Sequence, residues 1–191
     1  MPILHIDSAI TGKQSATRAL TAGIVRSLAA HDSDAEVVYR DLAAQPLAHL
    51  TLPAFGHAES LAVLQEFQAA DTVVIGAPMY NFTIPSQLKA WIDRLLVAGT
   101  TFRYTETGAA EGLMGGKRVI VAVARGGLYG EDSAQRSVEH AERYLADVFA
   151  FIGIHDVEFI IAEGLKVSDE MREAAMRRAH ERAKGVVPAV A

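Results

Sequence analysis

The run TVVIGA at residues 72–77 decides how the chain is expected to fold. It is short, apolar and rich in β-branched residues, and it lacks the polar alternation of a half-exposed strand. Such a run predicts a strand buried on both faces of a parallel sheet. Pro78 disfavours helix at the residue before it, so the strand is expected to end there. The run TIPSQL at residues 83–88 places a hydroxyl at an N-cap and a proline in the first turn, which predicts a helix start.

Four side chains with distinct chemistry lie between this strand and this helix. Met79, Tyr80, Asn81 and Phe82 supply a thioether, a phenol, an amide and a phenyl ring. In open α/β sheets, ligands bind beside the loops at the carboxyl ends of the strands. The stretch therefore predicts a site for an aromatic ligand with polar edges.

Working outward, strands and helices alternate along the whole chain. Strands are expected at residues 3–6, 36–40, 72–77, 118–124 and 157–162. Helices are expected at residues 15–30, around 61–67, and at 85–97, 138–152 and 169–184, with a long loop at 41–56 and an excursion at 99–116. This alternation predicts an α/β fold with right-handed crossovers and helices on both faces of a doubly wound, five-stranded parallel sheet. The expected strand order is the flavodoxin-like 2-1-3-4-5, in one domain covering residues 1–191.

Composition excludes several classes of protein. The chain has 191 residues, a net charge of −5 and no cysteine. The charge disfavours a nucleic-acid surface, and the lack of cysteine excludes disulfides, thiolate nucleophiles and cysteine-ligated metals. The seven histidines lack metal-ligand spacing, so we expect no metal site. No signal-peptide pattern or run of about 20 apolar residues occurs, so a cytoplasmic protein without a membrane span is expected.

The loop after the first strand is rich in hydroxyl groups and ends where a helix begins. Ser8 and the run Ser15-Ala16-Thr17 lie in it. A helix N-terminus presents free amides and a positive dipole end, which suits a phosphate monoester. Ordinary N-capping by serine and threonine is an equally good explanation of these residues alone.

Two further stretches could complete a site. Arg125-Gly126-Gly127 follows a buried strand, and adjacent glycines allow the backbone to approach a flat ligand and donate amides to it. A simple tight turn is the alternative. Phe102-Arg103-Tyr104 lies in the excursion, where it could complete a site, contact a second subunit, or form a small satellite core.

These motifs together resemble the FMN-dependent NADH azoreductases, also described as FMN-dependent NADH:quinone oxidoreductases. The resemblance spans nearly the whole chain. It is carried by residues 78–82, 87–89, 99, 101–106, 115–117, 125–127, 151–154 and 162–164. It implies a flavodoxin-like homodimer that binds FMN near the subunit interface.

The resemblance also implies roles for individual residues. Ser8, Ser15, Ala16 and Thr17 would hold the phosphate; Met79, Tyr80, Asn81 and Phe82 would border the isoalloxazine; Ala124, Arg125, Gly126 and Gly127 would contact its pyrimidine edge. The chain departs from the family pattern in three places. Ala124 stands where serine is common, Ala16 has no side-chain donor, and the segment 53–61 is short.

The implied reaction passes two electrons from NADH or NADPH through bound FMN to a quinone or an azo bond. The nicotinamide and the acceptor are expected to use the same face of the flavin, which predicts ping-pong kinetics. Because the flavin carries the chemistry, we expect no catalytic side chain. Tyr129, Tyr104 and Phe102 are candidates for substrate contacts. An FMN electron carrier without nicotinamide turnover is the alternative, and the physiological acceptor and the choice between NADH and NADPH stay open.

Overall fold

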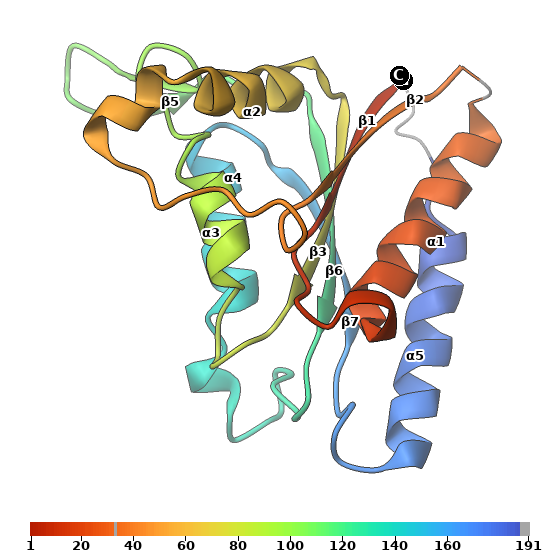
Figure 1. Ribbon diagram of the computed structural model, residues 1–191. Helices are drawn as coiled ribbons and strands as arrows, with labels where there is room; N and C mark the ends of the chain where they lie inside the picture. The colour runs from red at the N-terminus through yellow and green to blue at the C-terminus, as the bar shows by residue number, and fades with distance from the viewer. Residues whose placement is uncertain (33, 188–191) are drawn as a thin grey trace.

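The computed structural model describes residues 1–32 and 34–187. Its centre is a five-stranded sheet in the order β2-β1-β3-β6-β7, in which all four neighbouring pairs are parallel (Figure 1). The strands are β1 (Pro2–Asp7), β2 (Glu36–Asp41), β3 (Thr72–Pro78), β6 (Arg118–Ala124) and β7 (Asp156–Ala162). The expected α/β fold with a five-stranded parallel sheet is confirmed.

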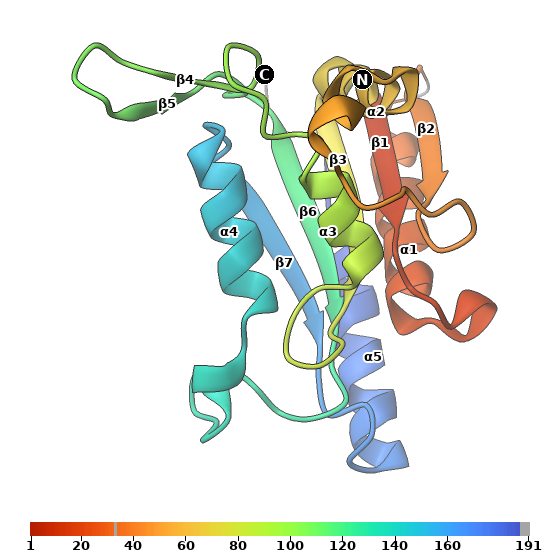
Figure 2. The ribbon, with the colours of Figure 1, turned by 60° about the vertical axis from the view of Figure 1, so that its left-hand side comes forward.

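Helices cover both faces of the sheet. On one face lie α1 (Ala16–His31) and α5 (Asp169–Lys184), side by side (Figure 1). On the other lie α2 (Ala58–Ala69), α3 (Ser86–Ile92) and α4 (Ala141–Phe151) (Figures 1 and 2). Each layer buries its own apolar cluster against the sheet. Helices on both faces are what a parallel sheet needs to bury both of its surfaces.

The central strand β3 behaves as its sequence predicts. All seven of its residues are buried. Val74 packs in the cluster under α1 and α5, whereas Val73 and Ile75 pack in the cluster under α2, α3 and α4. Adjacent side chains therefore face opposite layers, which explains why the run has no polar alternation.

The excursion folds into a two-stranded hairpin, which the sequence did not predict. β4 (Phe102–Tyr104) pairs antiparallel with β5 (Ala110–Gly112), at the end of the sheet where the parallel strands begin (Figure 2). A Cβ on Gly112 would lie 2.1 Å from the backbone nitrogen of Gly153, so glycine is required for the hairpin to pack there. Because the hairpin supplies the fourth and fifth strands, the order predicted as 2-1-3-4-5 is written 2-1-3-6-7 in the numbering of the structure.

Some predicted boundaries shift. The helix expected at 85–97 ends at Ile92, and the Thr101 hydroxyl donates to the Leu95 carbonyl in the turns that follow. The helix expected from residue 138 starts at Ala141, and Val138 lies in a short 3₁₀ turn. A second 3₁₀ turn, Leu52–Gly56, interrupts the loop at 41–56. Among the described helices, none combines the length and apolar character that crossing a membrane requires.

Candidate functional site

The loops at the carboxyl ends of β1, β3, β6 and β7 surround a hollow of about 410 Å³, which we call the first hollow. It lies at the switch point of the sheet, where the connections from β1 and β3 leave toward opposite faces. Its lining residues are Thr11, Gln14, Ser15, Ala16, Pro78, Met79, Tyr80, Asn81, Phe82, Ala124, Arg125, Gly126, Gly127, Tyr129, Leu165, Lys166 and Arg172. The fold thus brings the three predicted stretches to one place.

The wall after β3 is a tight turn. Tyr80 N donates to Thr83 O at 2.9 Å, and Thr83 N donates back to Tyr80 O at 3.1 Å. The two residues between them, Asn81 and Phe82, have φ angles of 47° and 73°. Two consecutive positive φ angles inside a reciprocal bond pair define a type I′ turn. Asparagine accepts this backbone well, but a phenylalanine there is strained.

The strained residue presents its ring to the hollow. Phe82 is 48% exposed, and its ring meets the ring of Tyr129 edge to face at 6.4 Å. Neither burial nor backbone preference explains a phenylalanine at this position. Strain of this kind concentrates at functional sites, where the surrounding structure holds it.

Comparing two variants of Phe82 measures this strain. Phe82→Ala and Phe82→Gly both remove the ring, but only glycine relieves the positive φ angle. We expect Phe82→Gly to be the more stable by about 1 kcal/mol in urea unfolding of the ligand-free protein, although glycine costs backbone entropy. At an ordinary position the order is reversed, so a more stable Phe82→Ala would contradict the strained turn.

A second wall is the N-terminus of α1. The Ser15 hydroxyl caps the helix by accepting from Arg18 N at 3.2 Å, while the main-chain N–H groups of Ala16 and Thr17 have no acceptor within the described residues. Two free amides at the positive end of a helix form an anion site.

The hydroxyls predicted to join this site differ in position. Ser8 is fully buried, and its hydroxyl donates to Gly76 O at 2.6 Å. Thr17 is also fully buried, and its hydroxyl lies 2.9 Å from the Ser15 hydroxyl. Neither residue lines the first hollow. In this structure the side chains of Ser8 and Thr17 therefore satisfy internal bonds, and the amide of Ala16, which lines the hollow, is what the wall offers to an anion.

An ion pair that sequence reasoning missed holds this loop. The Arg18 guanidinium binds both carboxylate oxygens of Asp41, at 2.7 and 2.8 Å, and donates to Ala9 O at 3.0 Å. The hydrogen bonds from Arg18 lower the pKa of Asp41 to about 2. The pair ties the first turn of α1 to the end of β2, which fixes the direction of the free amides.

The third wall is formed by Gly126 and Gly127. Their carbonyls accept from Lys166 N at 2.9 Å and Gly164 N at 2.8 Å, so the loop continues the ladder between β6 and β7. Their own N–H groups have no acceptor in the described part of the chain. A Cβ on Gly126 would lie 3.2 Å from the Lys166 side chain, and one on Gly127 would lie 3.1 Å from the Tyr129 ring. The glycines thus leave room for two free donors.

Arg125 supports the site through buried ion pairs. Its side chain is 1% exposed and forms ion pairs with Glu142, with Glu163 at 3.5 Å and with Glu139 at 3.8 Å. Burial lowers the pKa of the guanidinium. The main-chain N–H of Arg125 is also occupied, since it donates to Ala162 O at 2.9 Å. Arg125 therefore ties the loops together, and its donors do not face a ligand.

Two of the candidates for substrate contacts lie elsewhere. Tyr129 lines the first hollow. Phe102 and Tyr104 belong to β4, at the opposite end of the sheet (Figure 2). Phe102 packs against Phe151 with ring centroids 4.8 Å apart, and against Tyr104 at 5.6 Å. Within one chain these two residues form a satellite cluster and do not reach the hollow.

Two cations at the site were not expected from the sequence. Lys166 and Arg172 line the first hollow from the loop after β7 and from the start of α5. The sequence signal was that Lys166 follows closely after the end of a predicted strand, and this signal is weak. Across residues 1–32 and 34–187, no group of three or more His, Cys, Asp or Glu side chains is arranged to hold a metal ion.

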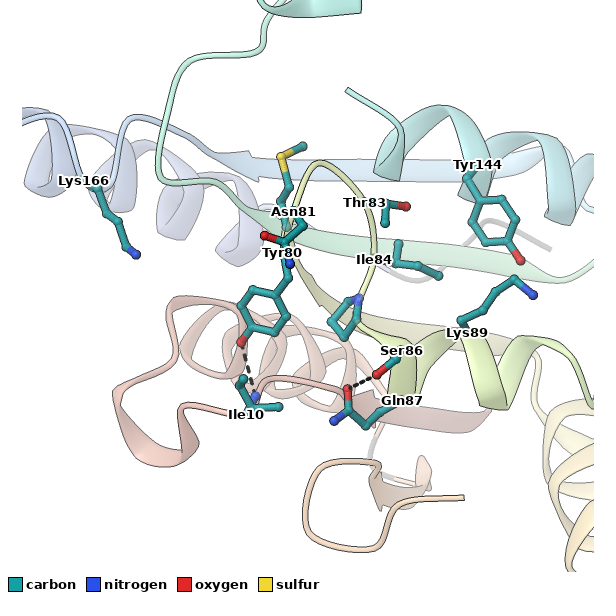
Figure 3. Close-up of a pocket in the computed structure, with 12 residues that line it drawn as sticks. Ile10, Tyr80, Asn81, Thr83, Ile84, Ser86, Gln87, Lys89, Tyr144 and Lys166 are labelled. Carbon is teal, nitrogen blue, oxygen red and sulfur yellow. Dashed lines mark hydrogen bonds between the residues drawn. The ribbon is translucent and has the colours of Figure 1, made fainter. Parts of the chain in front are cut away.

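A second hollow, about 850 Å³, adjoins the first (Figure 3). Its lining residues are Ile10, Met79, Tyr80, Asn81, Thr83, Ile84, Pro85, Ser86, Gln87, Lys89, Tyr144 and Lys166. Four of these, Met79, Tyr80, Asn81 and Lys166, also line the first hollow. The type I′ turn and Lys166 therefore form the border between the two spaces.

Comparisons with known proteins agree with this geometry. The family described as having a flavodoxin-like fold matches residues 1–186. The chain is 51% identical over 195 residues to an FMN-dependent NADH:quinone oxidoreductase of Xanthomonas campestris, covering 94% of this chain and 96% of the relative. It is 54% identical over 190 residues to FMN-dependent NADH:quinone oxidoreductase 2 of Bradyrhizobium diazoefficiens, covering 92% and 94%.

Solved structures give the same result. An FMN-dependent NADH-azoreductase of Bacillus anthracis in complex with FMN superposes with a TM-score of 0.82 and is 27% identical, covering 97% of this chain and 99% of that chain. An azoreductase from another strain of the same species has a TM-score of 0.84, also at 27% identity, covering 97% and 100%.

Proposed function

The chain belongs to the flavodoxin-like fold family, among the FMN-dependent NADH:quinone oxidoreductases and azoreductases, and from this membership we propose how its own residues carry out that chemistry. It is an FMN-dependent oxidoreductase that uses NADH to reduce quinones and azo compounds. The observation that carries the assignment of the site is the set of unpaired main-chain donors on two walls of one hollow.

These donors fit the parts of FMN. The free amide of Ala16, at the positive end of α1, suits the phosphate. The free amides of Gly126 and Gly127 suit the carbonyl oxygens of a pyrimidine ring, and the missing Cβ atoms leave room for a flat ligand. Between them, the turn of Met79, Tyr80, Asn81 and Phe82 borders the ring system. Ala124 has no polar side-chain atom to offer, and its carbonyl already accepts from Met79 N at 2.8 Å.

When bound, FMN supplies a centre that takes a hydride from the nicotinamide and gives the electron pair to the acceptor. In balance, NADH, a proton and a quinone give NAD⁺ and a hydroquinone. An azo bond needs two NADH and two protons to give two amines. The chain's share is to bind and orient: the Gly126 and Gly127 amides, fixed in advance by the β6–β7 ladder, would donate to the pyrimidine edge and stabilise negative charge there.

Three finer points belong to the same proposal. The nicotinamide and the acceptor would use the same face of the bound flavin in turn, which gives ping-pong kinetics. A homodimer with FMN near the subunit interface belongs to the proposal too, and the 65% exposed side chain of Tyr104 is available to contact a second chain. A cytoplasmic location completes the proposal. An FMN electron carrier is the alternative, and it differs by having no turnover with nicotinamide.

One experiment tests this function. Purified protein loaded with FMN should be yellow, should bleach when NADH is added without oxygen, and should regain its colour with a quinone in steady turnover. Bleaching without turnover would favour the electron carrier. A protein that takes up no FMN would contradict both.

A further inference from the structure

The chemistry of the second hollow is unusual for a chain with a net charge of −5. Two lysines, Lys89 and Lys166, line it, and none of its twelve lining residues is acidic. The rest of the lining combines apolar side chains such as Ile84 and Pro85 with hydroxyls such as Thr83. An apolar floor with cations at its sides suits a flat aromatic ligand that carries an anionic substituent.

The two lysines lie on opposite sides of this hollow and differ in their pairing (Figure 3). Lys89 is bound to Asp93 one helical turn along α3. Beside it, burial and the charge of Asp93 raise the pKa of Tyr144 to about 12, so its hydroxyl stays a neutral donor. Lys166 forms no ion pair or side-chain hydrogen bond with the described residues, so its ammonium is the cation left for a ligand.

The position of Lys166 is nevertheless defined. Its N–H donates to Gly126 O at 2.9 Å, and its aliphatic carbons lie across Gly126, 3.2 to 3.5 Å from where a Cβ would stand. A long charged side chain that packs its stem on the backbone keeps its ammonium group in solvent at a fixed edge. Figure 3 shows this group directed toward the side of the hollow where Tyr80 and Ile10 lie.

The two hollows are also continuous. They share Met79, Tyr80, Asn81 and Lys166, so a ligand in the second hollow would reach the border of the first. If FMN occupies the first, an aromatic group in the second has access to its ring past the type I′ turn. Proximity of this kind is what an electron acceptor requires.

We propose that the second hollow receives the anionic end of an aromatic acceptor whose reacting group lies in the first hollow, and that Lys166 determines specificity there, by favouring acceptors that carry a sulfonate or carboxylate group. The inference rests on the proposed function, because it assigns one partner of the same reaction. Lys166 acts on binding and is not a catalytic residue. Its contribution is that of a partly exposed ion pair, which is worth about a fivefold change in affinity.

A matched pair of dyes tests the proposal. Methyl orange carries a sulfonate, and its analogue lacking that group is neutral and otherwise has the same aromatic frame. Isothermal titration calorimetry of oxidised, FMN-loaded protein without NADH should give a dissociation constant for methyl orange that Lys166→Gln raises about fivefold and Lys166→Glu raises further. Binding of the neutral analogue should not change, and Lys166→Arg should keep the wild-type preference.

The control is Lys184→Gln, which removes the same charge from the far end of α5. It should leave both dissociation constants unchanged, and so separates a local effect from net charge. Equal affinities of wild-type protein and Lys166→Gln for methyl orange, or an equal loss for both dyes, would overturn the inference alone. Failure of the wild-type protein to retain FMN would overturn the proposed function and this inference with it.

Discussion

Replacing Ala16 with aspartate is expected to weaken FMN binding by a hundredfold or more, while making the ligand-free protein slightly more stable. Ala16 is the first residue of α1 and lines the first hollow at the wall where the free amides lie. A carboxylate there faces the bound phosphate. At about 5 Å and an effective dielectric constant of about 20, each pair of like charges costs about 3 kcal/mol, or more than a hundredfold in affinity.

The expected gain in stability of the ligand-free protein also comes from the negative charge of the new aspartate. A negative charge in the first turn interacts favourably with the positive end of the helix, by about 0.3–1 kcal/mol at an exposed position. For a chain of this size that corresponds to a rise of about 1–3 °C in the unfolding temperature. Thermal unfolding without FMN measures the change in stability. Titration of the apoprotein with FMN, followed by flavin fluorescence, measures the change in FMN affinity.

Two controls isolate the charge. Ala16→Asn has nearly the same shape as the aspartate variant and should bind FMN within a few-fold of wild type. Riboflavin lacks the phosphate, so its affinity should be the same in wild-type protein and in both variants. If Ala16→Asp binds FMN as well as Ala16→Asn does, the phosphate does not lie at the start of α1.

Much of the fold follows from local pattern. The run at 72–77 lies in β3, and the helix expected at 169–184 has those bounds in the structure, because acids at its start and bases at its end match its dipole. The hairpin β4–β5 was missed because its strands are three residues each, too short for any period to appear. Its position depends on Gly112 and Gly153, whose close contact is a property of packing and not of local sequence.

The site shows a similar division. The turn at 80–83, the start of α1 and the pair Gly126-Gly127 could be located because each follows a buried strand or begins a helix. Which atoms face the hollow could not be read from the sequence. Ser8 and Thr17 have suitable hydroxyls, but these are buried and bonded within the chain. The free donors are main-chain amides, which every residue except proline possesses.

Arg125 is the clearest case of a residue with a different role from the one its motif suggests. Its position after β6, next to two glycines, resembles a ligand contact, but its guanidinium meets three carboxylates that come from two other segments. Glu139 and Glu142 lie at the start of α4, and Glu163 lies after β7. Glu163 also accepts from Tyr129 N at 2.9 Å, so the same cluster fixes the loop that carries Tyr129.

Replacing Arg125 with methionine is accordingly expected to cost about 3–5 kcal/mol of unfolding free energy at pH 7, because a buried charge loses its partner. Methionine keeps much of the volume, so the loss reports the charge more than a cavity. The side chain of Glu139 is fully buried, and its carboxylate would then keep only the partly exposed guanidinium of Arg136, at 3.8 Å. Arg125→Lys retains the positive charge with fewer hydrogen-bond donors, so it should lose clearly less unfolding free energy than Arg125→Met.

A second substitution tests the cause of this loss. The double variant Arg125→Met, Glu139→Gln should recover part of the loss at pH 7, because glutamine still offers an oxygen to the amides of Ala141 and Glu142 that Glu139 caps. Urea unfolding of the four proteins at pH 7 measures these free-energy differences. A cost below about 1 kcal/mol would mean that the cluster is solvated and does not hold the loops.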